Sequence, residues 1–362
     1  MRRLGLLWRA DRLLLFAAAG LAAYGAVFVT SAGENFYKHL LWIAIGLTGF
    51  LVAFLVDYRI FLKHAYPIFA FSLFTLVAVL FTRPINGASS WFKMGGISIQ
   101  PSEFMKLAFV LALAKYLMYR NNYRRLEGLT IPLLVALVPL GLILRQPDLG
   151  TAMVFVPILF AMLYAAGSRL RHLSLVSAGG VAGLAGLWLW AMKPYQQTRI
   201  HAWLNPELYR LREAWQLIHS QIAIGSGGFA GKGLGWGTIH KLHLLPEAHT
   251  DFIFAVVAEE WGLVGAMGLI ALVLLLGFAG VRIATRVREP AGRLVAVGLT
   301  VMFLAQSLIN ISVAVGLLPT TGITLPFVSY GGSSMLASFV ALGLIANIGA
   351  RRVLVLAPDD FA

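Results

Sequence analysis

The chain has 362 residues, of which 59% are apolar and only 12% are charged, with a net charge of +14 and no cysteine. An average soluble domain carries about 25% charged residues, so this composition excludes a water-soluble globular protein and a disordered chain. The lack of cysteine excludes disulfides and thiol chemistry. The remaining class is a polytopic membrane protein.

Ten apolar stretches predict ten transmembrane helices, because one span takes about 20 residues. They are Leu13–Val29, His39–Val56, Tyr66–Phe81, Phe104–Met118, Leu129–Leu144, Leu149–Ala166, Leu173–Met192, Phe252–Val281, Leu294–Leu318 and Met335–Ile348. We therefore expect an all-α polytopic membrane protein with a single transmembrane domain over residues 1–362 and no soluble domain at either end.

The distribution of Lys and Arg predicts how these helices are oriented. With the N-terminus in the cytoplasm, eighteen of the 29 basic residues fall in cytoplasmic segments and five in the short outer segments. Cytoplasmic loops of membrane proteins collect Lys and Arg, so both termini are expected inside. This rule and attraction to anionic lipid explain the positive charge, which therefore does not indicate a nucleic-acid partner.

One large extramembrane loop, residues 193–250, is expected on the outer side between the seventh and eighth spans. Within it, Ala214–Ile224 predicts a short amphipathic helix that lies in the membrane interface, with Trp215, Ile218 and Ile222 on one face. Seven glycines between Gly225 and Gly237 fit no phosphate-loop or dinucleotide motif. They predict a flexible loop that can approach a ligand closely.

Charged residues at the outer ends of spans are the first candidates for chemistry, because charges near the membrane core are costly and commonly functional. Glu103 and Lys106 lie three residues apart on one helix face and are expected to pair, as a structural ion pair or as part of a site. Asp148 directly precedes an apolar span, where it suits a helix N-cap, a role in a site, or both.

Asp251 stands where the outer loop enters the eighth span. A partly dry environment raises the pKa of a carboxyl group towards the range of a general base, and the alternative role is again an N-cap. Glu259 and Glu260 follow in the same span and are expected to face polar groups inside the bundle. The histidines nearby fit no standard zinc spacing, so no protein metal site is predicted.

Residues 318–334 join the last two spans and contain two prolines and three glycines among several hydroxyl side chains. This composition does not permit a regular helix. Irregular backbone at membrane depth is tolerated where it lines a cavity. We therefore expect this segment to form one wall of a polar cleft that opens to the outside.

Several of these motifs occur together in one order, and the chain resembles the SEDS family (shape, elongation, division and sporulation). The resemblance covers almost the whole chain through Trp91, Gln100–Lys106, Arg145–Thr151, Ile222–Gly233, Leu245–Glu260 and Pro319–Ser334. It implies ten transmembrane helices in the bacterial inner membrane and peptidoglycan glycosyltransferase activity on lipid II. The amino-acid sequence of Thr321–Pro326 resembles the elongation branch of the family more than the division branch.

The resemblance also implies site residues and partners. The family's essential acid falls on Asp251, and its other cavity positions fall on Glu103, Lys106 and Asp148. The implied partners are a class B penicillin-binding protein that crosslinks the product, the elongation machinery, membrane lipid, and the growing glycan strand that lipid II extends.

The chemistry expected from these residues is an inverting glycosyl transfer in which Asp251 acts as general base. The leaving pyrophosphate needs positive charge. A divalent cation, Mg²⁺ or Mn²⁺ held by Asp148 or Glu103, would serve the same purpose, and the sequence leaves that choice open. Further candidates for substrate binding are Lys106, Arg145, Arg199, Lys232, Ser329 and Ser333.

The rival interpretation is a transporter that flips lipid II, since acids in the bundle and broken helices occur in both classes. The enzyme is favoured because the acids cluster at outer helix ends, with no chain of charges across the bilayer and no obvious inverted repeat. A third interpretation, a non-catalytic scaffold, does not explain so many charges on the loop side.

Overall fold

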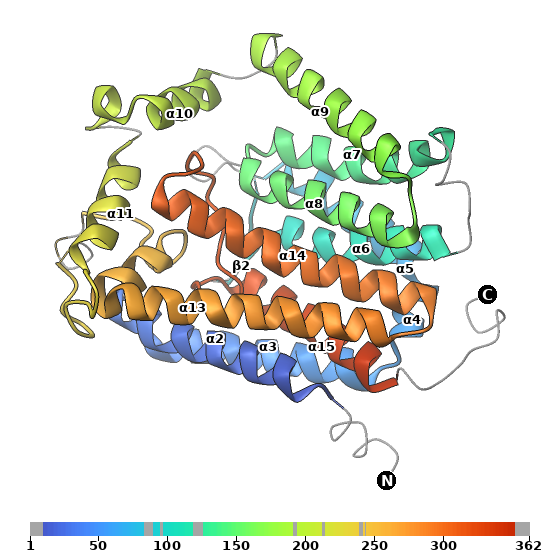
Figure 1. Ribbon diagram of the computed structural model, residues 1–362, viewed down its shortest axis with the longest axis horizontal. Coiled ribbons are helices and arrows are strands. Elements are labelled where there is room, and N and C mark those ends of the chain that lie inside the picture. The colour runs from blue at the N-terminus through green and yellow to red at the C-terminus, as the bar shows by residue number, and fades with distance from the viewer. Residues whose placement is uncertain are drawn as a thin grey trace.

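The computed structural model describes residues 10–82, 90–94, 97–118, 126–190, 194–211, 214–238, 242 and 244–351. Their helices form a bundle whose long members run side by side (Figure 1). The helices are α2 (Arg12–Ser31), α3 (Phe36–Leu55), α4 (Tyr58–Lys63), α5 (Ala65–Val79), α6 (Pro101–Met118), η2 (Glu127–Leu129), α7 (Thr130–Arg145), α8 (Leu149–Ala166), α9 (Leu170–Trp190), α10 (Pro194–Leu204), η3 (Pro206–Tyr209), α11 (Trp215–Ser226), α13 (Ile253–Arg286), α14 (Pro290–Val315) and α15 (Gly332–Arg351).

Each of the ten predicted apolar stretches coincides with one of these helices. Within the described part of the chain, seven helices are long and apolar enough to cross a membrane, namely α2, α3, α7 with η2, α8, α13, α14 and α15. The other three are α5, which has 15 residues, α6, which carries Glu103, Lys106 and Lys115, and α9. The fold class is therefore confirmed, and the count of ten spans stays a prediction.

A short antiparallel hairpin, which the sequence did not predict, precedes α6. It consists of β1 (Phe92–Met94) and β2 (Ile97–Ile99), with Lys93 paired to Ser98. The strands are followed at once by Gln100 and the start of α6. The hairpin therefore fixes how the chain enters the helix that carries Glu103 and Lys106.

One end of the bundle gathers the segments that were predicted to be cytoplasmic. Arg282 of α13 pairs with Asp11, and Arg351 of α15 pairs with Asp57 at 3.0 Å. The loop helices α10 and α11 lie at the opposite end (Figure 1). The segments predicted to be cytoplasmic and the large loop predicted to be outside thus lie at opposite ends of the fold. The orientation in a membrane stays a prediction.

The predicted amphipathic helix is present as α11 (Trp215–Ser226), and the face that it packs on the protein is the one opposite Ile222. Leu217, Ser220 and Ala223 are buried, whereas Ile222 is 48% exposed. The helix packs on α13 and α14, and the Ser220 hydroxyl donates to the Ala314 carbonyl at 2.8 Å. The Trp215–Ile218–Ile222 face is therefore left partly or largely exposed, and its contact with the membrane interface stays a prediction.

The glycine-rich segment packs closely on a helix backbone, and its predicted approach to a ligand stays a prediction. Helix α13 breaks at Gly262, whose φ is 62°. The loop supplies partners to the backbone groups freed there: Lys232 N donates to the Glu259 carbonyl at 3.0 Å, and Leu263 N donates to the Gly228 carbonyl at 2.9 Å. The break is therefore stabilised by backbone from the loop, as irregular backbone in a membrane protein requires.

Replacing Gly227 with Ala is expected to lower the free energy of unfolding by about 1–3 kcal/mol, a typical cost of overpacking. A Cβ at Gly227 would collide with the Ala258 carbonyl oxygen, whereas a Cβ at Gly225 would meet nothing within 4 Å. Thermal melting of the purified protein measures the effect, with Gly225→Ala as the control that should be neutral or stabilising. Equal melting of both variants would contradict the docked loop.

Candidate functional site

The turn that carries Asp251 is held to α14 and to the segment after it by three consecutive backbone carbonyls. The His249 carbonyl accepts from Tyr330 N at 2.9 Å, and the Thr250 carbonyl accepts from the Ser329 hydroxyl. The Asp251 carbonyl accepts from Asn310 Nδ2 of α14 at 2.8 Å. The main chain on either side of the Asp251 carboxylate is thereby fixed without using the carboxylate itself.

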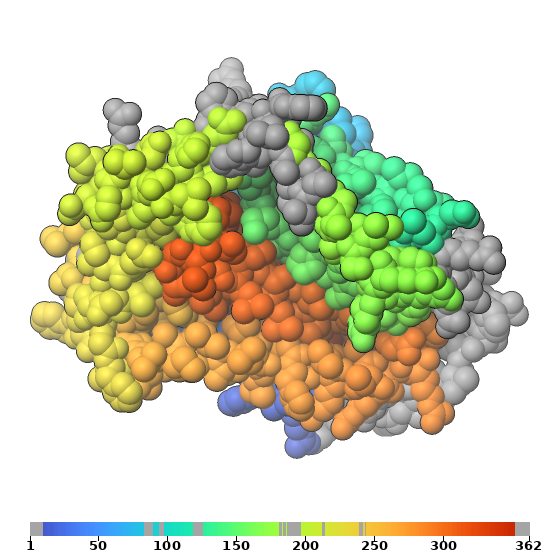
Figure 2. All heavy atoms as spheres, turned by 45° about the horizontal axis from the view of Figure 1, so that its top comes forward, coloured from blue at the N-terminus to red at the C-terminus, as the bar shows by residue number. Residues whose placement is uncertain are grey.

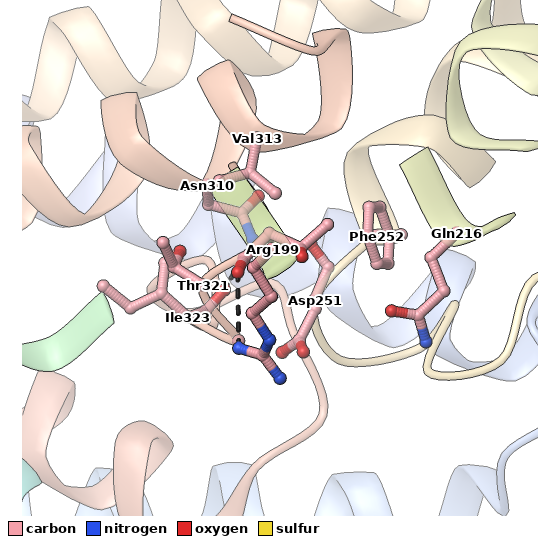
Figure 3. A pocket seen from close by; sticks show the side chains of 10 residues that line it. Arg199, Gln216, Asp251, Phe252, Asn310, Val313, Thr321 and Ile323 are labelled. Carbon is pink, nitrogen blue, oxygen red and sulfur yellow. Dashed lines mark hydrogen bonds between the residues drawn. The ribbon is translucent and has the colours of Figure 1, made fainter. Parts of the chain in front are cut away.

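A cavity of about 60 Å³ lies beside this carboxylate at the loop end of the bundle. Figure 2 shows that α10 and the segment after α14 meet at the surface there. The predicted irregular segment does form one wall, and Figure 3 shows how the wall and Asp251 face each other. The lining residues are Arg199, Gln216, Asp251, Phe252, Asn310, Val313, Thr320, Thr321, Gly322 and Ile323.

Asp251 is not the N-cap of the eighth span. Helix α13 begins at Ile253, and its N-cap position is Phe252, which makes no side-chain cap. The Asp251 side chain instead faces the cavity, and a Cβ at Gly322 would stand 3.5 Å from its Oδ2. The carboxylate is therefore available to a ligand.

The surroundings of Asp251 raise the pKa of its carboxyl group to about 7. Burial is the largest cause, because it disfavours the charged form, and the negative charges of Glu247 and Asp148 add to it. Arg199 and a hydrogen bond from Thr250 act in the opposite direction. A carboxyl group with a pKa near neutral can both accept and release a proton under ordinary conditions.

The large loop supplies two of the lining residues, Arg199 from α10 and Gln216 from α11. Arg199 Nη1 donates to the Thr320 carbonyl at 3.4 Å, the dashed contact in Figure 3. The Trp203 indole fixes α10 by donating to the Gly316 carbonyl at 2.9 Å. The loop therefore completes the cavity with a cation beside Asp251.

Glu103 and Lys106 form the predicted ion pair, with 3.0 Å between Lys106 Nζ and Glu103 Oε1. Both side chains are buried, and Lys106 also donates to Gln306 Oε1 of α14 at 2.7 Å. Gln306 Nε2 in turn donates to the Thr324 carbonyl at 3.0 Å. The pair thus lies outside the cavity lining and supports the segment that forms the cavity wall.

Asp148 has the capping role that was one of its predicted alternatives. Its Oδ1 accepts from Thr151 N at 2.9 Å at the start of α8, and its Oδ2 accepts from Gln100 Nε2 at 2.9 Å. Burial raises the pKa of the Asp148 carboxyl, and the charge of Glu103 also raises it, against hydrogen bonds from Thr151. Asp148 acts on Asp251 through its charge.

The two predicted serines are engaged with the protein itself. The Ser329 hydroxyl accepts from Leu325 N at 2.8 Å and donates to the Thr250 carbonyl. The Ser333 hydroxyl accepts from Gln100 N at 3.0 Å and donates to the Ser98 carbonyl at 3.2 Å. Both therefore hold the site's framework, and neither lines the cavity.

Two predicted cations stand away from the cavity. Arg145 is exposed at the end of α7. Lys232 donates to the buried Glu259 at 2.7 Å, and Thr238 also donates to this carboxylate through its backbone and hydroxyl. Glu260 accepts from the Ser31 hydroxyl at 2.6 Å. Glu259 and Glu260 thus face polar groups, as predicted, and tie the loop and α2 to α13.

Two site residues, Gln306 and Asn310, were missed by the sequence analysis. They lie one turn apart on α14 and hold the Thr324 and Ile323 carbonyls, respectively. Two amide side chains four residues apart in an apolar span are a signal that could have been used, because polar groups in spans face the bundle interior.

Among the described residues, no group of three or more His, Asp or Glu side chains lies close enough to hold a metal ion. Glu103 is engaged by Lys106, and both Asp148 oxygens are engaged by Thr151 and Gln100. A divalent cation here would therefore need most of its ligands from substrate phosphate and water, as Mg²⁺ often has. The cation stays a prediction.

A second, larger cavity of about 510 Å³ has an apolar lining. It lies between α5, the hairpin, α6 and α15, and its lining includes Phe71, Phe92, Phe104 and Leu107. Pro101 and Phe104 belong to the first turn of α6, which also carries Glu103. This groove therefore reaches the end of the bundle where Glu103 and Lys106 lie.

Comparison with known proteins agrees with this architecture over nearly the whole chain. Residues 11–353 match the sequence model of the FtsW, RodA and SpoVE family, described as "Cell cycle protein". The chain belongs to this family. It is 38% identical to the "Probable peptidoglycan glycosyltransferase FtsW" of Trichlorobacter lovleyi, over 94% of this chain and 93% of that protein.

A second relative and a solved structure are also similar to this chain over nearly its whole length. The "Peptidoglycan glycosyltransferase RodA" of Treponema pallidum is 33% identical over 95% of this chain and 98% of that protein. A solved structure, described as "Structural coordination of polymerization and crosslinking by a peptidoglycan synthase complex", matches with a TM-score of 0.82 and 35% identity over 95% of this chain and 98% of that chain. The predicted family and enzyme class are confirmed, whereas the branch is not, because the relatives divide between FtsW and RodA.

Replacing Lys106 with Met is expected to lower the free energy of unfolding by about 3–5 kcal/mol, because Glu103 is left buried and unpaired. The double variant with Glu103→Gln should lose less than the sum of the single losses. Chemical unfolding in detergent measures this coupling, with Lys115→Met on the same helix as control. Strict additivity would contradict the pairing.

Proposed function

We propose that this protein is a glycosyltransferase that polymerises lipid II into glycan strands at the outer face of the bacterial inner membrane. The observation that carries the proposal is the Asp251 carboxylate. It faces a polar cavity, and the pKa of its carboxyl group is raised to about 7. Membership of the family supports lipid II as the substrate, because relatives that match nearly the whole chain are named peptidoglycan glycosyltransferases.

The proposed reaction is a direct, inverting displacement. The 4-hydroxyl of the lipid II N-acetylglucosamine attacks C1 of the N-acetylmuramic acid that ends the growing strand. As the new C1–O4 bond forms, the C1–O bond to the lipid pyrophosphate breaks, and the hydroxyl proton passes to the Asp251 carboxylate. The α-linked donor becomes a β-1,4 linkage. One base suffices for this step, and Asp251 is the acid that lines the cavity.

Negative charge on the leaving pyrophosphate must be stabilised as the bond breaks. Arg199 is the preferred group because it lines the cavity and, within the part of the chain that the structure describes, makes one long hydrogen bond, to the Thr320 carbonyl. Lys106 and Lys232 are engaged by Glu103 and Glu259. We therefore assign the pyrophosphate contact to Arg199, and a divalent cation would be an additional counter-charge.

The lipid part of the substrate needs an apolar place beside the polar site. The groove lined by Phe71, Phe104 and Leu107 offers one, since its wall includes the first turn of α6. Burial of an isoprenoid chain there would contribute affinity roughly in proportion to the apolar area removed from water. An enzyme explains the cavity at Asp251 better than a flippase does, because that cavity is small and lies at one end of the bundle.

Within this activity we propose the elongation role, that of RodA, on the wording of Thr321–Pro326, with the septal role of FtsW as the alternative. Expression in bacteria depleted of RodA or of FtsW distinguishes them. Restoration of the rod shape supports elongation, and relief of the division block supports the septal role.

We further propose that a class B penicillin-binding protein binds this chain and stimulates it through the large loop. The matched solved structure supports such a partner, because it is of a peptidoglycan synthase complex that coordinates polymerization and crosslinking. The loop carries Arg199 and Gln216 into the cavity, so a partner that repositions α10 or α11 would change the site. Binding can shift such a segment only through different affinity for its two positions.

Replacing Leu208 and Leu211 with Ser is expected to reduce stimulation by the partner about tenfold while leaving the rate without partner unchanged. Both side chains are more than 80% exposed on the loop, which makes them suited to an apolar contact. Glycan synthesis with and without the transpeptidase measures the effect. Leu170→Ser, equally apolar but at the other end of the fold, is the control, and unchanged stimulation would contradict this route.

The decisive test of the function is polymerisation of lipid II by the purified protein with its transpeptidase. Asp251→Asn should lower the rate by about 100-fold or more, because it removes a general base while the side-chain volume is kept. Normal melting shows that the variant is folded. Near-normal synthesis by the variant would remove Asp251 from the mechanism, and lipid II transport without polymerisation would support the flippase.

The pH dependence of synthesis should follow the protonation of Asp251. A base acts only when deprotonated, so the rate should rise with pH and reach half its maximum near pH 7, the pKa of Asp251. Glu247→Gln removes a negative charge that raises this pKa, so the acid limb should move to lower pH. If this substitution leaves the acid side of the pH–rate profile unchanged, or moves it to higher pH, Asp251 is not the base that the profile reports.

A further inference from the structure

Two buried polar atoms in the cavity wall have no hydrogen-bond partner among the described residues. They are the side-chain oxygens Oδ1 of Asn310 and Oγ1 of Thr321. The two residues are 1% and 6% exposed, and both line the cavity beside Asp251 (Figure 3). A buried polar atom without a partner costs about 1–3 kcal/mol, which a ligand can recover if it supplies the missing group.

The orientation of the Asn310 amide follows from its partners. Its nitrogen lies 2.7 Å from the Ile323 carbonyl oxygen and 2.8 Å from the Asp251 carbonyl oxygen. Carbonyl oxygens only accept, so the NH₂ group must face them and Oδ1 must be the unpartnered end. Because an amide oxygen has no hydrogen to donate, the missing partner must be an N–H or O–H donor.

The other groups around the cavity narrow the chemistry of that partner. The Thr321 hydroxyl can donate to an acceptor. Val313, Phe252 and Ile323 present apolar surface to the same space. The volume of about 60 Å³ accommodates a few water molecules or one small substituent. A donor, an acceptor and a methyl group would together satisfy the two oxygens and the apolar wall.

We propose that this part of the cavity is a subsite for the acetamido group of the acceptor sugar. The acetamido N–H donates to Asn310 Oδ1, its carbonyl oxygen accepts from the Thr321 hydroxyl, and its methyl group contacts Val313 and Phe252. The inference rests on the proposed function, in which lipid II offers an N-acetylglucosamine hydroxyl to Asp251. The acetamido subsite would orient the acceptor sugar. It would also reject sugars without an acetamido group, since their binding would leave the two buried oxygens unpaired.

The test uses Thr321→Val, which removes the hydroxyl and nearly keeps the volume. Because this hydroxyl has no hydrogen-bond partner among the described residues, the melting temperature should stay the same or rise. The KM for lipid II should nevertheless rise about three- to tenfold, the loss expected for one neutral hydrogen bond. Thr321→Ser keeps the hydroxyl and should restore a KM near that of the wild type.

A matched control is Ser168→Ala at the end of α8. The Ser168 hydroxyl is likewise buried and has no hydrogen-bond partner in the described ranges, but Ser168 does not line the cavity. This variant should behave like Thr321→Val in melting and like the wild type in KM. A wild-type KM for Thr321→Val would overturn the subsite.

The substrate side of the test uses a lipid II analogue with glucose in place of N-acetylglucosamine, which stays uncharged. The wild type should use this analogue at least about tenfold less well than lipid II, because the subsite is left unfilled. Thr321→Val should discriminate several-fold less. Equal use of both lipids by the wild type would overturn the subsite alone, whereas a wild type that makes no glycan from lipid II with its partner would overturn the proposed function and the subsite with it.

Discussion

The position of Asp251 depends on three consecutive backbone carbonyls, of residues 249–251, which accept hydrogen bonds from Tyr330, Ser329 and Asn310. Each bond joins the entrance of α13 to α14 or to the segment that follows it, far along the sequence. Because the main chain carries the constraint, the Asp251 carboxylate is not needed for structure. It can therefore remain in an environment that raises its pKa, which suits a general base.

The polar side chains inside the bundle serve this constraint. Lys106 joins Glu103 to Gln306, and Gln306 holds the Thr324 carbonyl. Polar groups in a membrane-spanning bundle are costly unless they are paired, and a connected set of hydrogen bonds specifies one arrangement. The buried ion pair thus acts on the cavity through the wall segment, as a support for the residues that line it.

The large loop contributes in two ways, to the backbone of α13 and to the cavity. Its glycines lie against the break at Gly262, and Lys232 pairs there with Glu259. This contact fixes the first turns of α13, which follow Asp251 directly. Its helix α10 then places Arg199 at the cavity. A partner that binds the loop would therefore meet a segment already joined to the site.

Local properties of the sequence determined the fold class, the sites of the ten apolar helices, the Glu103–Lys106 pair and the cap at Asp148, because each depends on composition or on residues within one turn. The packed face of α11, the docking of Gly227 on α13 and the meeting of Arg199 with Asp251 were decided only in three dimensions. Each of these depends on backbone and side chains brought together from distant segments, and no spacing along one helix encodes which groups will meet or remain unpaired.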